Sequence, residues 1–325
     1  MATIVCVHGI AQQQYGADVL ENLWLPALAS GVRAAGFDVL ADRLWRDRAS
    51  PEGIEARMAF YGHLFLRPDQ QGDAPGDLTP EEARIAQTLG EEWLTRGAVR
   101  SSSVRVKQAA ARELAYLRGQ VGTQEQGARA LARHVLSSVA RVPWFARVGM
   151  ALAERFVDRA LQQVTQYLMD DAVRAAVLTT VTALVDAETQ IVVGHSLGSV
   201  IAYEAAHQLT HPLPLLVTLG SPLGLDTIIV QRLHPQPPGF PPFVRRWVNI
   251  ADREDLIAAE PNLAPLFSEG LPAGAIFESG YTVDNGAEPH RADFYLTKAQ
   301  TGKPVGETLS VSHGGAMCRS HGKGS

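Results

Sequence analysis

Hydrophobic and polar positions along the first part of the chain predict a strand, a helix and two further strands. The apolar run "TIVCVHGI" (residues 3–10) is typical of a buried strand, and "NLWLPALASGVRAAGF" (22–37) carries apolar residues at helical spacing. The segments "DVLADRLWR" (38–46) and, less regularly, "ARMAFYGHLFL" (56–66) are predicted as strands. The chain therefore opens as strand, loop, helix, which is the usual beginning of an α/β fold.

The middle of the chain has a helical pattern with few breakers. Thr79 and Pro80 predict a helix start, with Thr79 as the cap and Pro80 at the first helical position. Helical spacing then recurs in five segments: "PEEARIAQTLGEEWL" (80–94), "VKQAAARELAYLRG" (106–119), "GARALARHVLSSVARV" (127–142), "ARVGMALAERFVDRALQQVTQYL" (146–168) and "DAVRAAVLTTVTALV" (171–185). These segments predict a large helical insertion over residues 79–187.

Strands return after the insertion. "QIVVGHS" (190–196), "LPLLVTLGS" (213–221) and "RRWVNIAD" (245–252) predict three, and "GAIFESGYTV" (274–283) is a weaker fourth candidate. We expect an α/β fold with a mostly parallel sheet, whose core is built from residues 1–78 and 188–310. The glycine-rich end, from residue 311 to 325, is expected to be a flexible tail.

Composition narrows the range of functions. The formal net charge is −5, with 29 basic and 34 acidic residues, so no global field would attract nucleic acid. No apolar run approaches the length of a membrane span, and the first residues lack the features of a signal peptide, so we expect a cytoplasmic protein. Cys6 and Cys318 imply no disulfide framework. No metal-ligand spacing is visible, and neither a metal nor an organic cofactor is expected.

One motif carries chemistry. Gly194-His195-Ser196-Leu197-Gly198 matches G-x-S-x-G and lies between a predicted strand and a predicted helix. A sharp strand-to-helix turn strains the backbone and leaves no room for neighbouring side chains, so the two glycines clear space beside Ser196. The serine hydroxyl would then lie at the positive end of the helix, where an oxyanion is stabilised. This setting predicts that Ser196 is a nucleophile.

A serine nucleophile needs a base and an acid that orients the base. His290, in the loop segment "EPHRADFYL", is a better candidate base than His313, which lies in glycine-rich sequence near the end. Asp252 and Asp255 both follow a predicted strand, where catalytic groups of such sheets lie. The remaining need is an oxyanion hole made of two backbone N–H groups. The candidates are those of Leu197 and of Ile10, in the loop after the first strand.

The chain resembles the α/β-hydrolase superfamily, and within it intracellular lipase-like serine esterases. The resemblance rests on "VCVHGI", "VVGHSLGSVIAYE", "VTLGSPLG", "WVNIADREDLIA" and "PHRADFYL", which together cover less than half of the chain. It favours Asp255 over Asp252 as the acid, because an Asp followed by an apolar pair resembles the corresponding lipase turn. It implies a Ser196-His290-Asp255 triad that cleaves small-molecule or lipid esters through an acyl-enzyme.

Several alternatives stay open at this point. The same triad serves thioesterases, amidases, peptidases and acyltransferases, and the chain could instead be an interaction or signalling module without turnover, or an effector gated by a partner. The insertion is either a lid or acyl-binding cap that also contacts anionic lipid, or a helical subdomain packed on the sheet with its arginines in solvent. We favour the packed subdomain. The sequence predicts no oligomeric state.

Overall fold

A six-stranded parallel sheet forms the centre of the fold. The computed structural model describes residues 2–65, 79–120, 128–145, 150–258 and 260–320. Within them the strands lie in the order β2-β1-β3-β4-β5-β6, and every neighbouring pair is parallel. Their bounds are β1 (Ile4–Val7), β2 (Ala56–Ala59), β3 (Ile191–His195), β4 (Leu213–Leu219), β5 (Val244–Asp252) and β6 (Ile276–Val283).

Alternate residues of the central strands enter two separate hydrophobic clusters, one on each face of the sheet. In β1, Val5 and Val7 belong to one cluster, whereas Ile4 and Cys6 belong to the other. This is the period of two that a strand imposes on its side chains. Because both faces are apolar, the strands read as continuous hydrophobic runs in the sequence.

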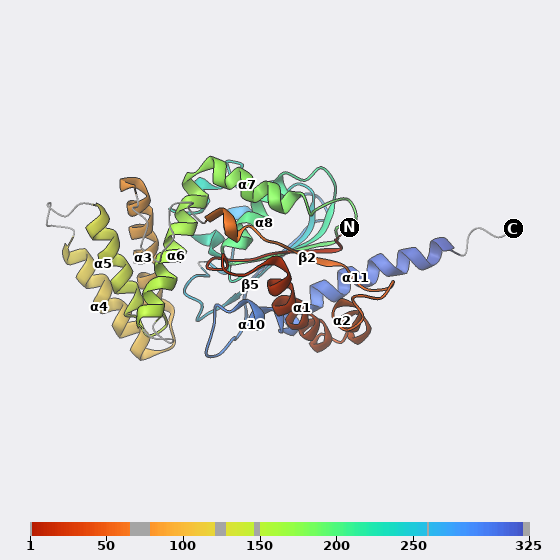
Figure 1. Ribbon diagram of the computed structural model, residues 1–325, viewed down its shortest axis with the longest axis horizontal. Coiled ribbons are helices and arrows are strands. Elements are labelled where there is room, and N and C mark those ends of the chain that lie inside the picture. The colour runs from red at the N-terminus through yellow and green to blue at the C-terminus, as the bar shows by residue number, and fades with distance from the viewer. Residues whose placement is uncertain (1, 66–78, 121–127, 146–149, 259, 321–325) are drawn as a thin grey trace.

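Helices cover both faces of this sheet (Figure 1). The cluster that contains Val5 packs under α7 (Asp171–Thr182) and α8 (Leu197–His207). The opposite cluster packs against four other helices: α1 (Ala17–Ala34), α2 (Asp38–Leu44), α10 (Ala292–Leu296) and α11 (Ala299–Ser320). Short helical turns occupy the connections: η1 (Gly62–Phe65), η3 (Pro222–Gly224), η4 (Val230–Arg232) and α9 (Ala264–Phe267).

Four helices of the insertion gather at one end of the molecule (Figure 1). They are α3 (Pro80–Arg100), α4 (Val104–Gln120), α5 (Ala128–Ala140) and α6 (Met150–Met169). Helix α3 begins as predicted, with a capping box in which Thr79 and Glu82 satisfy each other's backbone N–H groups. Across the described residues, no helix has the length and apolar character needed to cross a bilayer.

The insertion packs into the sheet's own core. Trp93, Val135 and Phe145 share one hydrophobic cluster with Val5 and Val7 of β1. The basic residues between 96 and 118 differ from one another: those of α4 are exposed, as expected, but Arg96 of α3 is buried.

Three sequence predictions are corrected by the structure. Residues 38–44 form helix α2 and not a strand, because Ala41 and Leu44, one helical turn apart, are the residues that become buried. The strand predicted over 56–66 ends at Ala59, where the chain turns toward η1. Helix α11 continues to Ser320, whereas the sequence predicted a tail from residue 311; residues 321–325 lie outside the described residues.

Candidate active site

Ser196 occupies the corner between β3 and α8. Its φ is +54° and its ψ is −129°, a strained conformation that non-glycine residues rarely adopt. A hydrogen bond to the neighbouring strand stabilises this corner: the Ser196 N–H donates to the carbonyl oxygen of Leu219, in β4, at 3.0 Å. Its flanks require glycine, since a Cβ at Gly198 would lie 2.2 Å from the carbonyl oxygens of Val7 and His8. One at Gly194 would lie 2.5 Å from the Gly198 carbonyl oxygen.

A chain of hydrogen bonds joins Ser196, His290 and Asp255, which come from three separate loops. The Ser196 Oγ lies 3.0 Å from His290 Nε2, and His290 Nδ1 lies 2.8 Å from Asp255 Oδ2. A carboxylate only accepts hydrogen bonds, so Nδ1 carries the imidazole proton and Nε2 is left to accept one from the serine. The geometry therefore matches a nucleophile, a base and an acid that orients the base.

The Asp255 carboxylate is fully buried and has four hydrogen-bond donors around it. Oδ1 accepts from the N–H groups of Ile257 and Ala258, at 3.0 and 3.3 Å. Oδ2 accepts from His290 and from the Tyr295 hydroxyl, the latter at 2.8 Å. Burial is the main cause that raises the pKa of Tyr295 well above its usual value, so the phenol keeps its proton.

Asp252, the alternative acid, contacts backbone and not His290. Its Oδ1 accepts from the Glu254 N–H at 2.7 Å, and its Oδ2 accepts from the Asn285 N–H. The Asp252 N–H in turn donates to the Tyr295 hydroxyl at 2.9 Å. Burial raises the pKa of this carboxyl above its usual value. Asp252 thus ties the end of β5 to the segment that leads to His290.

His195, inside the motif, supports the backbone of His290. Its Nε2 lies 2.9 Å from the His290 carbonyl oxygen, and the two imidazole rings are 4.7 Å apart. Burial lowers the pKa of His195 well below its usual value, so the ring is neutral. The carbonyl can only accept, which places the His195 proton on Nε2.

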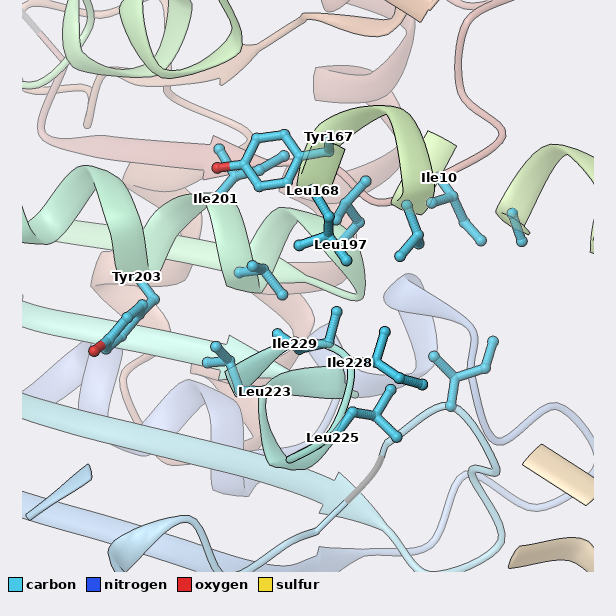
Figure 2. Close-up of a cluster of buried hydrophobic side chains, with 14 of the residues drawn as sticks. Ile10, Tyr167, Leu168, Leu197, Ile201, Tyr203, Leu223, Leu225, Ile228 and Ile229 are labelled. Carbon is cyan, nitrogen blue, oxygen red and sulfur yellow. The ribbon is translucent and has the colours of Figure 1, made fainter. Parts of the chain in front are cut away.

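The loop after β1 lies against Ser196. His8 Nδ1 lies 2.7 Å from the Gly9 carbonyl oxygen, and in a trans peptide the Ile10 N–H points the opposite way. Gly9 contacts Ser196 so closely that a Cβ there would lie 2.9 Å from the Ser196 Cβ. The side chains of Ile10 and Leu197 are anchored in the same apolar cluster (Figure 2). The first N–H groups of α8, including that of Leu197, have no partner within the helix.

A cavity of about 490 Å³ opens above Ser196 and His290. Most of its wall is apolar, and the apolar side chains include Ile10, Leu20, Leu23, Trp24, Trp144 and Phe145. Its rim carries Glu288, Arg291 and Asp293. Arg291 is paired with both acids, at 3.0 Å from Glu288 Oε2 and at 2.9 Å between its Nε and Asp293 Oδ1. The rim therefore has one net negative charge.

The structure brings together Ser196, Asp255 and His290, and places Ile10 and Leu197 beside them. His313 lies in α11, and its side chain is outside the described part of the chain.

Sequence reasoning missed Gly220, Tyr295 and Trp144, among other residues of the site. Gly220 has a φ of +53°, and a Cβ there would lie 2.9 Å from Asp255 Oδ2. The "LGS" at the end of β4 was a local signal for this glycine. Tyr295 and Trp144 have no local signal, since only the tertiary fold brings them to the acid and to the cavity.

Among the described residues, no cluster of three or more His, Cys, Asp or Glu side chains is suited to hold a metal ion. Comparison with protein-family models gives no match for the chain, and comparison with curated proteins and with solved structures gives none either.

Proposed function

We propose that the protein is a serine hydrolase that cleaves carboxylic esters through an acyl-enzyme. The observation that carries this proposal is the hydrogen-bonded chain from Ser196 Oγ through His290 to Asp255, with Ser196 on a strained corner at the N-terminus of α8. A G-x-S-x-G sequence that occurred by chance would give no reason for a histidine and a buried carboxylate to lie in a hydrogen-bonded chain with its serine hydroxyl.

The arrangement of the sheet also supports an α/β-hydrolase type of fold. Ser196 follows β3, Asp255 follows β5 and His290 follows β6, so all three lie at the carboxyl ends of parallel strands. Their order along the chain is Ser, Asp, His, which is the order of that superfamily.

In the proposed reaction, Ser196 Oγ attacks the ester carbonyl carbon while its proton moves to His290 Nε2. Asp255 stabilises the imidazolium that forms. The carbonyl oxygen becomes an oxyanion, which accepts hydrogen bonds from the Ile10 and Leu197 N–H groups. The tetrahedral intermediate then expels the alcohol, which takes the proton from His290. Water, activated by the same histidine, releases the acid and restores Ser196.

The cavity favours uncharged esters with a compact apolar group. Trp24, Trp144 and Phe145 offer aromatic surface for such a group close to the serine. Arg291 is the one cation in the cavity lining of the described residues, and its charge is already offset by Glu288 and Asp293. A substrate phosphate or carboxylate would therefore find no free countercharge there.

The test is intact-protein mass after incubation with a fluorophosphonate, with Ser196→Ala and His290→Ala as variants. We expect one adduct on the wild type and none on either variant. Hydrolysis of p-nitrophenyl acetate, butyrate and octanoate then sizes the acyl site, and matched thioester and anilide substrates compare the alternative leaving groups. A folded wild-type protein that forms no adduct and cleaves none of these substrates would overturn the proposal.

A further inference from the structure

The insertion contacts the proposed oxyanion loop through one buried side chain. Gln163 lies on α6 and is 5% exposed. Its Oε1 accepts a hydrogen bond from the Ala11 N–H at 2.8 Å, and its Nε2 donates to Gln13 Oε1 at 2.9 Å. A helix about 150 residues away in sequence thus holds the segment that directly follows Ile10.

This contact stabilises an unfavourable backbone conformation. Ala11 has a φ of +58°, in the left-handed region that non-glycine residues seldom occupy. Both polar atoms of the Ile10–Ala11 peptide are bound to glutamine side chains. Its N–H donates to Gln163, and its carbonyl oxygen accepts from Gln12 Nε2 at 3.2 Å. Without these partners the strained turn has little to keep it from relaxing.

The neighbouring peptide, Gly9–Ile10, carries the proposed oxyanion donor. His8 fixes its carbonyl oxygen from one side. The Ile10–Ala11 peptide constrains the Gly9–Ile10 peptide from its other end, because the orientations of these two peptides together set the backbone angles of Ile10. The direction of the Ile10 N–H therefore depends on Gln163.

We propose that Gln163 is a positioning residue for the oxyanion hole, so that the helical insertion contributes to transition-state stabilisation and not only to the wall of the cavity. This inference rests on the proposed function. An oxyanion-hole donor acts only when it is aimed at the developing charge, and removing one such donor costs roughly 10²–10³ in kcat in well-studied enzymes. A donor that is still present but points in the wrong direction should lower kcat by a smaller factor.

The main variant is Gln163→Met, which keeps the length of the side chain and removes both hydrogen bonds. The matched control is Gln162→Met on the same helix, because Gln162 bonds to Asp158 and not to the loop. Gln163→Glu keeps an acceptor for Ala11 and serves as the conservative variant. Gln13→Met removes the second partner of Gln163, and so tests the same contact should the first variant fail to fold.

The readouts are steady-state kinetics on p-nitrophenyl butyrate and carbon-13 NMR of a trifluoromethyl ketone labelled at its carbonyl. Ser196 adds to that carbonyl carbon, its proton passes to His290, and the former carbonyl oxygen occupies the oxyanion hole. The pH at which this hemiketal oxygen ionises reports how strongly the hole stabilises the charge.

We expect Gln163→Met to lower kcat about tenfold with KM changed less than twofold, since the interaction is made in the transition state. The hemiketal should ionise at a higher pH than in the wild type. Gln163→Glu should recover part of kcat, Gln13→Met should shift both readouts in the same direction by less, and Gln162→Met should match the wild type.

Failure of the role proposed for Gln163 and failure of the proposed function would give different results. An active wild type whose kcat and hemiketal ionisation are unchanged in both Gln163→Met and Gln13→Met would overturn the role of Gln163 alone. A wild type that forms neither the ketone adduct nor the phosphonate adduct would overturn the proposed function, and this inference with it.

Discussion

Two aspartates three residues apart have different surroundings. Asp255 accepts from the imidazole of His290, whereas both oxygens of Asp252 accept from backbone N–H groups. Tyr295 links them, since its hydroxyl donates to the Asp255 carboxylate and accepts from the Asp252 N–H. Asp252 therefore supports the loop geometry, and Asp255 orients the ring of His290, the proposed base.

Replacing each aspartate by asparagine should separate these roles. Asp255→Asn should lower kcat by roughly 10³–10⁴, because the amide favours the wrong tautomer of the histidine. Asp252→Asn should lower kcat less than tenfold but cost about 1–2 kcal/mol of stability, since one buried N–H loses its charged acceptor. Ester hydrolysis and urea unfolding of both variants test this. Equal losses of kcat would contradict the assignment.

His8 is a buried histidine that the fold keeps neutral. Its ring stacks on Tyr61 with centroids 4.0 Å apart, and the Tyr61 hydroxyl donates to the His8 carbonyl oxygen. Burial lowers the pKa of His8 from 6.5 to about 4. The unfolded chain therefore binds a proton at His8 more readily than the folded protein does between these two pH values.

Stability should consequently fall as the pH is lowered from 6.5 toward 4. Between pH 7 and pH 5, His8 alone accounts for a loss of about 2 kcal/mol in the free energy of unfolding. His8→Asn should remove this part of the pH dependence, whereas His63→Asn, at an exposed position, should leave it unchanged. Urea unfolding at the two pH values measures the difference. An identical loss in His8→Asn and wild type would show that His8 is not the group involved.

The site was predictable where its chemistry is local. Ser196 and its two glycines form a contiguous pattern, and His290 and Asp255 follow from chain order and from a family resemblance. Tyr295 and Gln163 were not predictable, because each acts on a residue far from it in sequence: Tyr295 contacts Asp255 at a separation of 40, and Gln163 contacts Ala11 at 152. Such contacts depend on tertiary packing, which periodicity does not encode.

Among the elements, the prediction was best for helix starts that satisfy their backbone groups locally and for strands with a clear hydrophobic pattern. The start of α3 at Pro80 and the strands β3 to β5 match the sequence pattern. Helix α2 was missed because seven residues are too few to distinguish a helix from a strand by periodicity. Its exposed Val39 resembles one side of an alternating strand, although it faces solvent from a helix.

The cap of α3 can be tested directly. Thr79→Ala removes the side-chain acceptor for the Glu82 N–H, at 3.3 Å, and should lower stability by about 1 kcal/mol. Thr88→Ala is a suitable control, because this exposed threonine lies within α3 and donates only to the Arg84 carbonyl. Thermal unfolding of the two variants gives the comparison. The cap contributes nothing if both have the same midpoint.

For the whole molecule, the shared hydrophobic cluster makes the insertion part of the core. Trp93, which is 2% exposed, packs against Phe145 with ring centroids 5.6 Å apart. The insertion is also tied to the loop that carries Asp255. The Trp144 Nε1–H donates to the Glu254 carbonyl at 2.8 Å, and Arg100 pairs with Glu260 at 3.0 Å.

The insertion and the sheet should therefore unfold together. Trp93→Ala should cost about 3–5 kcal/mol and lower the midpoint of a single calorimetric transition. Val99→Ala, at an exposed site on the same helix, should change it little. Hydrogen exchange should show weaker protection in β1 as well as in α3. Two separate transitions, or a loss of protection limited to the insertion, would show that the two parts are independent.

The position of β1 also has a consequence for synthesis. In the sheet, β1 lies between β2 and β3. Strand β2 follows β1 closely along the chain, whereas β3 is synthesised only after the whole insertion. At about 5–20 residues per second, a ribosome needs on the order of ten seconds to make residues 60–190. During that interval one edge of β1 has no strand to pair with and is open to other chains. The nascent protein thus passes through a period in which it needs protection from aggregation.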